Sequence, residues 1–497
     1  MQRLDVHRPA EPLRSRVRLG PVPRCLERVH VGSPPTGVRA ATHGIVLTPK
    51  RGRGLRTRAA QGLRTASRRA ATAVRASSVG TTPLRTSRDF RLLFVAALPA
   101  GLGMGVVGLA LFVQAYDLTG SPATLGYLGL VQFLAMLVGM FGGSAIVDHV
   151  DRRLLLLLTH GGFALSVTAL LVGSLLGDPP IGLLFVTSAF SSAVASLHFP
   201  TRSAMIPPVV ERADLTTAMT LETAVWNATM IVGPILGGMI LERSGLSTAY
   251  AFALVCYAVT LLVMFPLRRQ PAHREGEAGR VGLAAIRYGF RYLRPRPVLR
   301  GLLWIDLIAM VFGMRRALFP VLAIQQFGRG PAAVGLLMAA IPAGALVVSL
   351  TGNWLGNVRR QGLGLVVAAA TWGVAVTGFG LSGDDLGLAL LLLAVAGGAD
   401  IVAAILRATI IQHEVPDAVR GRVWGINFLV LNGGPRLGDL TAGLMASAWG
   451  ATISVVAGGL AALVGIGVYA VAVPDLPRYT SEDSIDPVED PAPWRET

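Results

Sequence analysis

The chain has 497 residues, of which 52% are apolar and only 15% are charged. Soluble domains carry about 25% charged residues, so this composition excludes an ordinary water-soluble protein. The apolar residues form uncharged runs at 154–176, 363–382 and 451–473. Each run matches the roughly 20 residues that a helix needs to cross the hydrocarbon core of a bilayer. The sequence therefore predicts a membrane protein.

The net charge of +17 lies almost entirely in an N-terminal arm, residues 1–87. The arm holds 18 Lys and Arg against three acids, which leaves 27 bases and 25 acids, or +2, for the rest of the chain. It has no apolar run long enough to offset the entropy of ordering it. Three interpretations compete: a tail attracted to anionic lipid, a nucleic-acid-binding arm, or upstream sequence translated from an early start. The last is favoured, with the folded body beginning near Val79 and no nucleic-acid partner.

Hydropathy and helix breakers predict an all-α membrane protein with twelve transmembrane helices in two sets of six. The first set is expected at 91–114, 123–147, 153–175, 180–199, 216–241 and 246–266. The second set is expected at 299–323, 332–356, 362–382, 385–406, 422–446 and 450–473. The predicted organisation is an arm, a six-helix bundle, a cytoplasmic linker with a short helix, a second bundle and an acidic tail, at 1–87, 88–266, 267–298, 299–475 and 476–497.

Arginine is distributed unevenly between the loops. The loops after even-numbered spans carry Arg152, Arg153, Arg202, Arg212, Arg268 to Arg296, Arg359, Arg360, Arg420 and Arg422. The loops after odd-numbered spans carry only Arg243 and Arg329. Cytoplasmic loops of membrane proteins are enriched in Lys and Arg. We therefore expect a multi-pass protein of the cytoplasmic membrane, with the even loops and both termini in the cytoplasm.

The two sets of spans repeat one another. Each has an arginine where its fourth span ends, Arg202 and Arg407, and a Gly-Pro pair in its fifth span, Gly233-Pro234 and Gly434-Pro435. Parallel six-span repeats place a substrate site near the membrane midplane between the halves. A Walker A sequence is absent from the chain, so we expect no ATPase on it to drive transport. The two cysteines, Cys25 and Cys256, provide no disulfide or metal framework.

Two motifs in the first half resemble signatures of the major facilitator superfamily. Residues 144–153 are similar to the cytoplasmic signature G-x-L-a-D-R-x-G-R-R, and they keep Asp148, Arg152 and Arg153 but not its two glycines. The resemblance implies that Asp148 meets helix ends and basic residues and latches the inner side shut. A charged loop that merely obeys the topology rules is the alternative. The second motif resembles the G-P-x-x-G-G signature of the exporter branches, and it consists of Gly233, Pro234, Gly237 and Gly238.

A series of motifs in the second half is similar to the branch that contains the enterobactin exporter and related drug-efflux carriers. Its members are at 315–320, 339–344, 397–402 and 416–423. The resemblance implies a monomeric carrier, not an enzyme, that needs no cofactor or metal and exports a siderophore or another amphipathic molecule in exchange for protons. An importer of the same fold is the main alternative, because fold does not set direction. A receptor, an enzyme or a channel is less well supported, since no catalytic cluster or filter-like loop is present.

Ionisable residues inside the predicted spans are candidates for proton coupling, because each costs about 2.5–3.5 kcal/mol to insert. They are Asp306, Glu222, Asp439, Arg436 and Asp400. Asp306 is favoured, since it has no partner close in sequence; an arginine on another helix would be the competing explanation. Asp400 is expected to pair with Arg407, and Arg436 with Asp439 three residues on. Glu222 and Arg407 are also placed to extend to the cytoplasmic interface.

Several other polar or aromatic residues in the spans are candidates for lining a substrate cavity. They are Gln132, Trp226, Asn227, His198, Arg315 and Arg316. For Gln132, Trp226, Asn227 and His198, packing between helices is the competing explanation.

Overall fold

The computed structural model describes residues 80–177, 179–270, 283–313 and 315–480. The chain divides into two units, Met1–Arg75 and Ala76–Thr497, and the described residues all belong to the second unit. Its described residues form helices and no strands, which confirms the predicted all-α fold. Three segments lie outside the described residues: the arm up to residue 79, part of the linker (271–282) and most of the acidic tail (481–497).

The first described helix of the N-terminal half lies just after Val79, near which the sequence predicts that the folded body begins. Residues 82–86, assigned above to the arm, form a short helix, α2 (Thr82–Thr86), that packs against the first long helix. The hydroxyl of Ser87 accepts a hydrogen bond from the backbone N–H of Phe90 at 3.1 Å and caps that helix. The long helices of this half are α3 (Arg88–Thr119), α4 (Pro122–His149), α5 (Arg152–Leu175), α6 (Ile181–Met205) and α7 (Leu215–Met264).

The C-terminal half follows a linker that contains α8 (Leu283–Leu293), the short helix expected there. Its helices are α9 (Pro297–Ile308), α10 (Phe319–Gln325), α11 (Pro331–Thr351), α12 (Gln361–Gly380), α13 (Leu386–Glu414), α14 (Asp417–Trp449), α15 (Ala451–Ala472) and α16 (Asp475–Arg478). The predicted tail therefore starts with α16, whose Leu476 is buried against α9 and α12.

Ten helices in the described residues are long and apolar enough to cross a membrane. One of them covers two predicted spans, because α7 runs through Gly245, whose positive φ of 79° separates two helical segments. α14 is not among these ten apolar helices. It is more polar than they are, and its polar residues include Asn427, Asn432, Arg436 and Asp439. The ten helices and α14 together account for the twelve predicted spans.

The seventh span differs from the continuous helix predicted at 299–323. After α9 the chain forms a π-helical turn (Ala309–Gly313) and a 3₁₀ turn (Arg316–Leu318) before α10 begins. Such a break leaves backbone N–H groups without intrahelical partners. Asp439 of α14 is a partner for one of these groups, because its carboxylate accepts a hydrogen bond from the backbone N–H of Ala317 at 3.0 Å. A discontinuous span is tolerated where protein supplies these partners.

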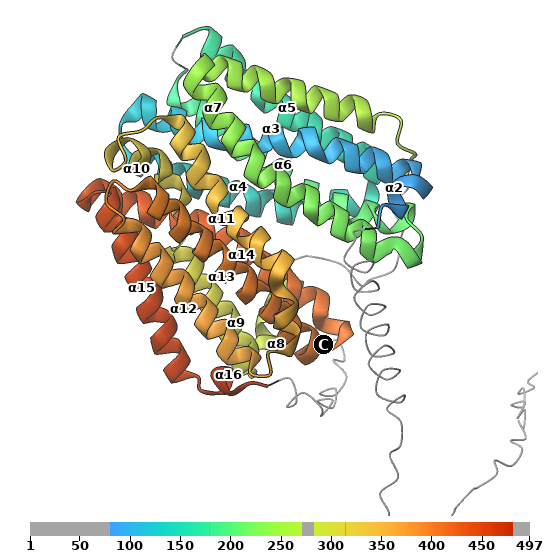
Figure 1. The fold of residues 1–497 in the computed structure, drawn as a ribbon. Helices are drawn as coiled ribbons and strands as arrows, with labels where there is room; N and C mark the ends of the chain where they lie inside the picture. Colours follow the sequence, from blue (N-terminus) through green and yellow to red (C-terminus); the bar gives the residue numbers. More distant parts are fainter. Residues whose placement is uncertain (1–79, 178, 271–282, 314, 481–497) are drawn as a thin grey trace, which may run out of the picture. The chain divides into compact units, whose positions relative to one another are not determined.

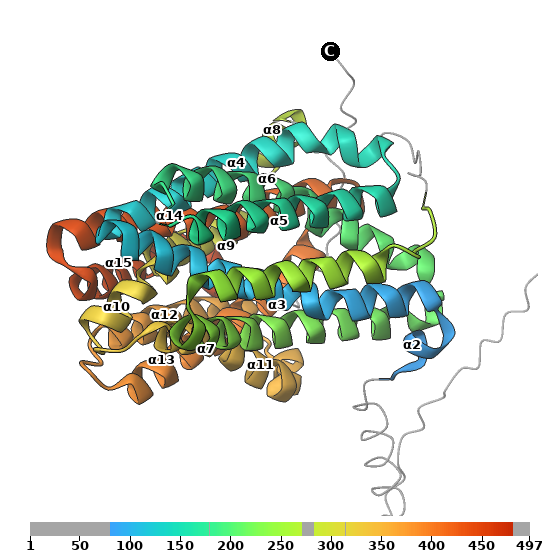
Figure 2. The same ribbon diagram turned by 90° about the horizontal axis from the view of Figure 1, so that it is seen from above.

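The two halves pack together at the end of the bundle that carries loops 120–121, 326–330 and 450 and the kink of α7 at Gly245, here called the closed end. Its contacts join α7 to α11 and α4 to α14. Glu242 of α7 accepts the backbone N–H of Ala332 at 2.8 Å. Figure 1 shows the helices of the two halves diverging from this end toward α2, α8 and α16. Figure 2 shows α3 and α7 side by side in the N-terminal half, where they pack closely.

Candidate functional site

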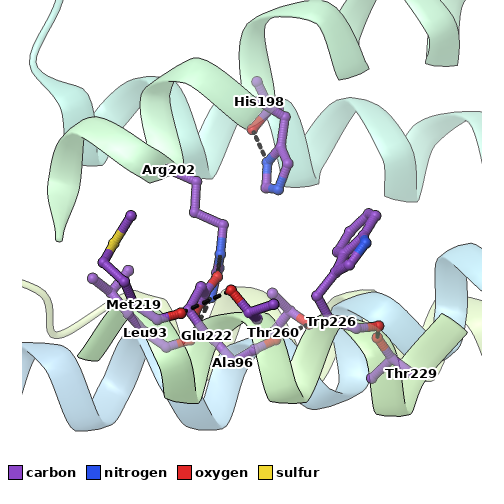
Figure 3. Close-up of polar contacts among 11 residues, drawn as sticks. Leu93, Ala96, His198, Arg202, Met219, Glu222, Trp226, Thr229 and Thr260 are labelled. Carbon is purple, nitrogen blue, oxygen red and sulfur yellow. Dashed lines mark hydrogen bonds and ion pairs between the residues drawn. The ribbon is translucent and has the colours of Figure 1, made fainter. Parts of the chain in front are cut away.

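A buried ion pair lies in the N-terminal half (Figure 3). The Nε and Nη2 atoms of Arg202, near the end of α6, bind the two carboxylate oxygens of Glu222 on α7. Nη2 also donates to the carbonyl oxygen of Leu93 on α3 at 3.0 Å. Arg202 thus ties three helices together. The side chains of Arg202 and Glu222 keep 11% and 20% of their surface exposed, so a molecule in the adjoining cavity can reach them.

A cavity of about 420 Å³ adjoins this ion pair. It is formed by α3, α5, α6 and α7 together with Phe428 and Asn432 of α14, so both halves contribute to it. Its aromatic lining residues are Phe163, Phe199, Trp226, Tyr257 and Phe428. A mostly apolar cavity of this size with a few polar groups is typical of a small-molecule site.

Two histidines add polar groups to the lining. His198 contacts the hydroxyl of Thr159 through Nδ1 at 3.3 Å, and its ring points toward the space between Arg202 and Trp226 in Figure 3. The ring of His160 lies 4.7 Å from that of His198, centroid to centroid. Neither nitrogen of His160 has a hydrogen-bond partner among the described residues. The lining therefore combines aromatic rings, hydrogen-bonding groups and one ion pair.

The C-terminal half holds a second ion pair, between Arg407 of α13 and Asp306 of α9. Both side chains are almost fully buried. This pair corrects the expectation that Arg407 pairs with Asp400, and it matches the competing explanation given for Asp306, an arginine on another helix. The reason is geometric: seven residues along α13 separate Asp400 from Arg407 by about 10 Å of helix rise, whereas α9 packs against α13. Asp400 remains close enough to be attracted to Arg407 and Arg316.

The expected ion pair between Arg436 and Asp439 does not form. Asp439 binds the backbone of Ala317 at the break in the seventh span. Arg436 donates to the carbonyl oxygen of its own helix at Asn432, at 2.6 Å, and contacts the sulfur of Met136 on α4 at 3.4 Å. Sequence spacing allows the pair, but in the structure Asp439 binds a backbone N–H at the break in the seventh span and Arg436 binds Asn432 and Met136.

The cavity candidates separate into two groups. Trp226 and His198 line the cavity, whereas Gln132 and Asn227 are half-buried and are not among its lining residues. Arg315 is buried away from it, where it donates to the Ser454 hydroxyl at 3.0 Å.

Arg316 is likewise not among the lining residues. Its side chain is exposed and is attracted by Asp400 and Asp439. A role in substrate binding therefore has structural support at Trp226 and His198.

The arginines of the cytoplasmic signature bind the ends of two helices. Arg152 donates to the carbonyl oxygen of Ala204 in α6 at 3.0 Å. Arg153 donates to the carbonyl oxygen of Phe265, just after α7, and its guanidinium lies 5.7 Å from that ring. The side chain of Asp148 lies outside the described part of the structure. Its function as a latch stays a prediction.

The glycines of the span-5 motif allow close helix contacts on two sides. A Cβ at Gly237 would lie 3.0 Å from Cα of Val106 on α3, and one at Gly238 would lie 2.6 Å from the carbonyl oxygen of Pro331 in α11. Gly233 meets Gly105 of α3, where no side chain fits between the two backbones. Small residues are what permit such approach of membrane helices. The motif therefore packs α7 against α3 within its half and against α11 across the closed end.

Sequence reasoning missed Arg202 and His160 as site residues. Arg202 was counted among the loop arginines, although its repeat equivalent Arg407 was recognised as a charge in a span. The repeat itself was the available signal: in each half the arginine near the end of the fourth helix forms a buried ion pair. His160 carried no sequence signal, because its neighbours come from α6 and α7.

Two helical bundles that pack together at one end, with a cavity that both line and an ion pair inside each, form an architecture typical of membrane transporters. Residues 78–495 match the family model described as transmembrane secretion effector. The chain belongs to this family, which is part of the major facilitator superfamily.

Curated relatives and solved structures agree with that assignment. The chain is 28% identical over 343 residues to the enterobactin exporter of Citrobacter koseri and 27% identical to that of Shigella boydii, over 69% of this chain and 82% of each relative. A bacterial homologue of the human lysosomal transporter Spinster, in an inward-facing and unoccupied conformation, superposes with a TM-score of 0.63 at 15% identity, covering 81% of this chain and all of that one. A single-residue mutant of the nucleoside transporter NupG superposes with a TM-score of 0.62 at 14% identity, covering 80% of this chain and all of that one. At these identities the structures show the fold alone.

Proposed function

We propose that this protein exports a siderophore or another amphipathic small molecule across the cytoplasmic membrane in exchange for protons. The observation that carries the proposal is the cavity in the N-terminal half, to which Phe428 and Asn432 of the other half contribute. Its aromatic walls and polar groups suit a molecule with both apolar and hydrogen-bonding parts. The names of the curated relatives, enterobactin exporters, support a siderophore as the first candidate.

The orientation of the chain supports loading from the cytoplasm. The loops at the closed end are those that carry few arginines, and the loops at the opposite end are arginine-rich. By the positive-inside rule the closed end faces outward. The halves then meet on the outer side and diverge toward the cytoplasm, so that in this conformation substrate enters or leaves the cavity on the cytoplasmic side.

Asp306 is the proposed proton carrier. Its carboxylate is buried and its charge is balanced by Arg407. Protonation of Asp306 removes that balance and weakens the tie between α9 and α13, so the proton and a helix contact are linked. The seventh span, of which α9 is the first part, is broken just beyond this residue, which gives it a place to bend. Glu222, Asp400 and Asp439, with Arg436 beside Asp439, are the remaining candidates for proton coupling.

Inside-out membrane vesicles test the direction of transport. We expect vesicles with an acidic lumen to accumulate iron-free enterobactin, because protons leaving the lumen drive the substrate into it. The measurement is the ratio of lumenal to external substrate with and without the pH gradient, and vesicles lacking the protein serve as the control. Accumulation only in right-side-out vesicles would instead favour the importer.

A further inference from the structure

Aromatic rings form much of the wall of this cavity, which lies mainly in the N-terminal half. Phe199 and Trp226 pack edge to face with centroids 5.1 Å apart, and Phe163 and Tyr257 stack at 5.7 Å. Trp226 keeps 39% of its surface exposed, so its ring is available to a ligand. Aromatic faces attract cations through their quadrupoles, and Trp does so most strongly. A free carboxylate beside such rings would complete a cation site.

The cavity has one carboxylate among its lining residues, and that carboxylate is not free. Both oxygens of Glu222 bind the guanidinium of Arg202, at 3.0 Å for the Nη2–Oε2 contact. A two-point pair of this kind is the strongest and most directional contact between an arginine and a carboxylate. Among the lining residues that the structure describes, Arg202 and Glu222 alone carry a full charge, so their charges cancel where the ligand would lie.

We propose that Arg202 sets the substrate specificity of this cavity by neutralising Glu222, so that the cavity takes uncharged aromatic molecules and rejects lipophilic cations. The proposal rests on the function proposed above, in that the cavity is where substrate binds. The proposal distinguishes uncharged aromatic molecules from lipophilic cations, a class to which many drugs belong. The resemblance to siderophore and drug carriers leaves both substrate classes open. Specificity of this kind is the difference between the affinity for an uncharged ligand and the affinity for a cation. Arg202 sets it by removing the attraction of Glu222 for the cation.

The competing explanation is that Arg202 is only a structural tie. Its contacts to Leu93 and Glu222 hold α6 to α3 and α7, so its removal would also loosen the bundle. A structural tie predicts loss of stability and no new selectivity. A specificity residue predicts that a folded variant gains affinity for a class of ligand that the native protein rejects. Binding measurements on purified protein separate the two.

The test uses Arg202→Gln, which keeps a hydrogen-bond donor for Glu222 but removes the positive charge. We expect the affinity for tetraphenylphosphonium, a lipophilic cation, to rise at least about tenfold, and the affinity for uncharged triphenylphosphine oxide to change little. The double variant Arg202→Gln/Glu222→Gln is the matched control, and it should lose the gain because no charge remains. Equilibrium dialysis with each probe at fixed detergent concentration gives the dissociation constants, and a monodisperse size-exclusion profile checks folding.

The reverse variant keeps the proposal testable if Arg202→Gln does not fold. Glu222→Gln frees the positive charge, so tetraphenylborate, an anion of the same shape as the phosphonium, should bind at least about tenfold more tightly than to the native protein. Native protein that binds the phosphonium as tightly as the phosphine oxide, or folded variants with unchanged selectivity, would overturn the proposal. These assays require neither transport nor a proton gradient, so their outcome is independent of the vesicle test for export.

Discussion

Asp306→Asn should abolish accumulation driven by the proton gradient. A carrier that exchanges one proton per substrate accumulates substrate about tenfold for each pH unit, because one unit corresponds to about 1.4 kcal/mol. The amide of asparagine resembles a protonated carboxyl group but releases no proton, so the ratio should fall to one. Exchange of labelled for unlabelled substrate at equal pH should continue. Both quantities are measured in the same inside-out vesicles.

The ion pair with Arg407 makes a stability control necessary. Asp306→Asn leaves a buried guanidinium without its partner, which costs on the order of 3–5 kcal/mol. The double variant Asp306→Asn/Arg407→Gln removes the unpaired charge, so it should recover membrane abundance and remain uncoupled. Wild-type accumulation by Asp306→Asn would contradict the assignment. Loss of coupling in Asp439→Asn with a fully coupled Asp306→Asn would move the proton site to α14.

Gly238→Leu should shift the protein away from the closed-end conformation. A Cβ at Gly238 would already lie 2.6 Å from the Pro331 carbonyl oxygen and 3.0 Å from Cα of Ala332, across the contact between α7 and α11. Overpacking of this kind costs about 1–3 kcal/mol. A cost near 2 kcal/mol changes the ratio of two conformations by roughly 30-fold, so the population of the closed-end conformation should fall relative to the alternative.

Spin labels on the two halves measure this shift. Thr248 of α7 and Asp384, between α12 and α13, are exposed positions toward the closed end, one in each half. With both native cysteines replaced, double electron–electron resonance should show a longer label-to-label distance in Gly238→Leu than in the parent. Gly108→Leu is the matched control, because a Cβ there meets nothing within 4 Å. An unchanged distance distribution in Gly238→Leu would contradict the role assigned to this glycine.

The fold could be predicted largely from the sequence, because the membrane imposes it. Uncharged runs of about 20 residues have few alternatives to a membrane-spanning helix, and helices lie at each of the twelve predicted positions. The break in the seventh span was missed. It depends on Asp439, 122 residues further along the chain, which accepts the N–H of Ala317. No local pattern in 299–323 indicates that partner.

The partners of the buried charges were predicted poorly for a related reason. Sequence spacing finds pairs on one helix, such as Asp400 with Arg407 or Arg436 with Asp439. The structure forms its pairs between helices, Arg202 with Glu222 and Arg407 with Asp306. Which helices adjoin is a property of the bundle, and the repeat was the one feature of the sequence that related Arg202 to Arg407.

Proton movement during substrate entry tests the central claim most directly. Purified protein is reconstituted into liposomes that contain a pH-sensitive dye, with the membrane potential clamped at zero and no pH gradient imposed. Iron-free enterobactin is then added outside. Exchange predicts that the lumen becomes alkaline as substrate enters, and that Asp306→Asn shows no pH change. Substrate entry with an acidified lumen, or with no pH change in the wild-type protein, would contradict proton-coupled export.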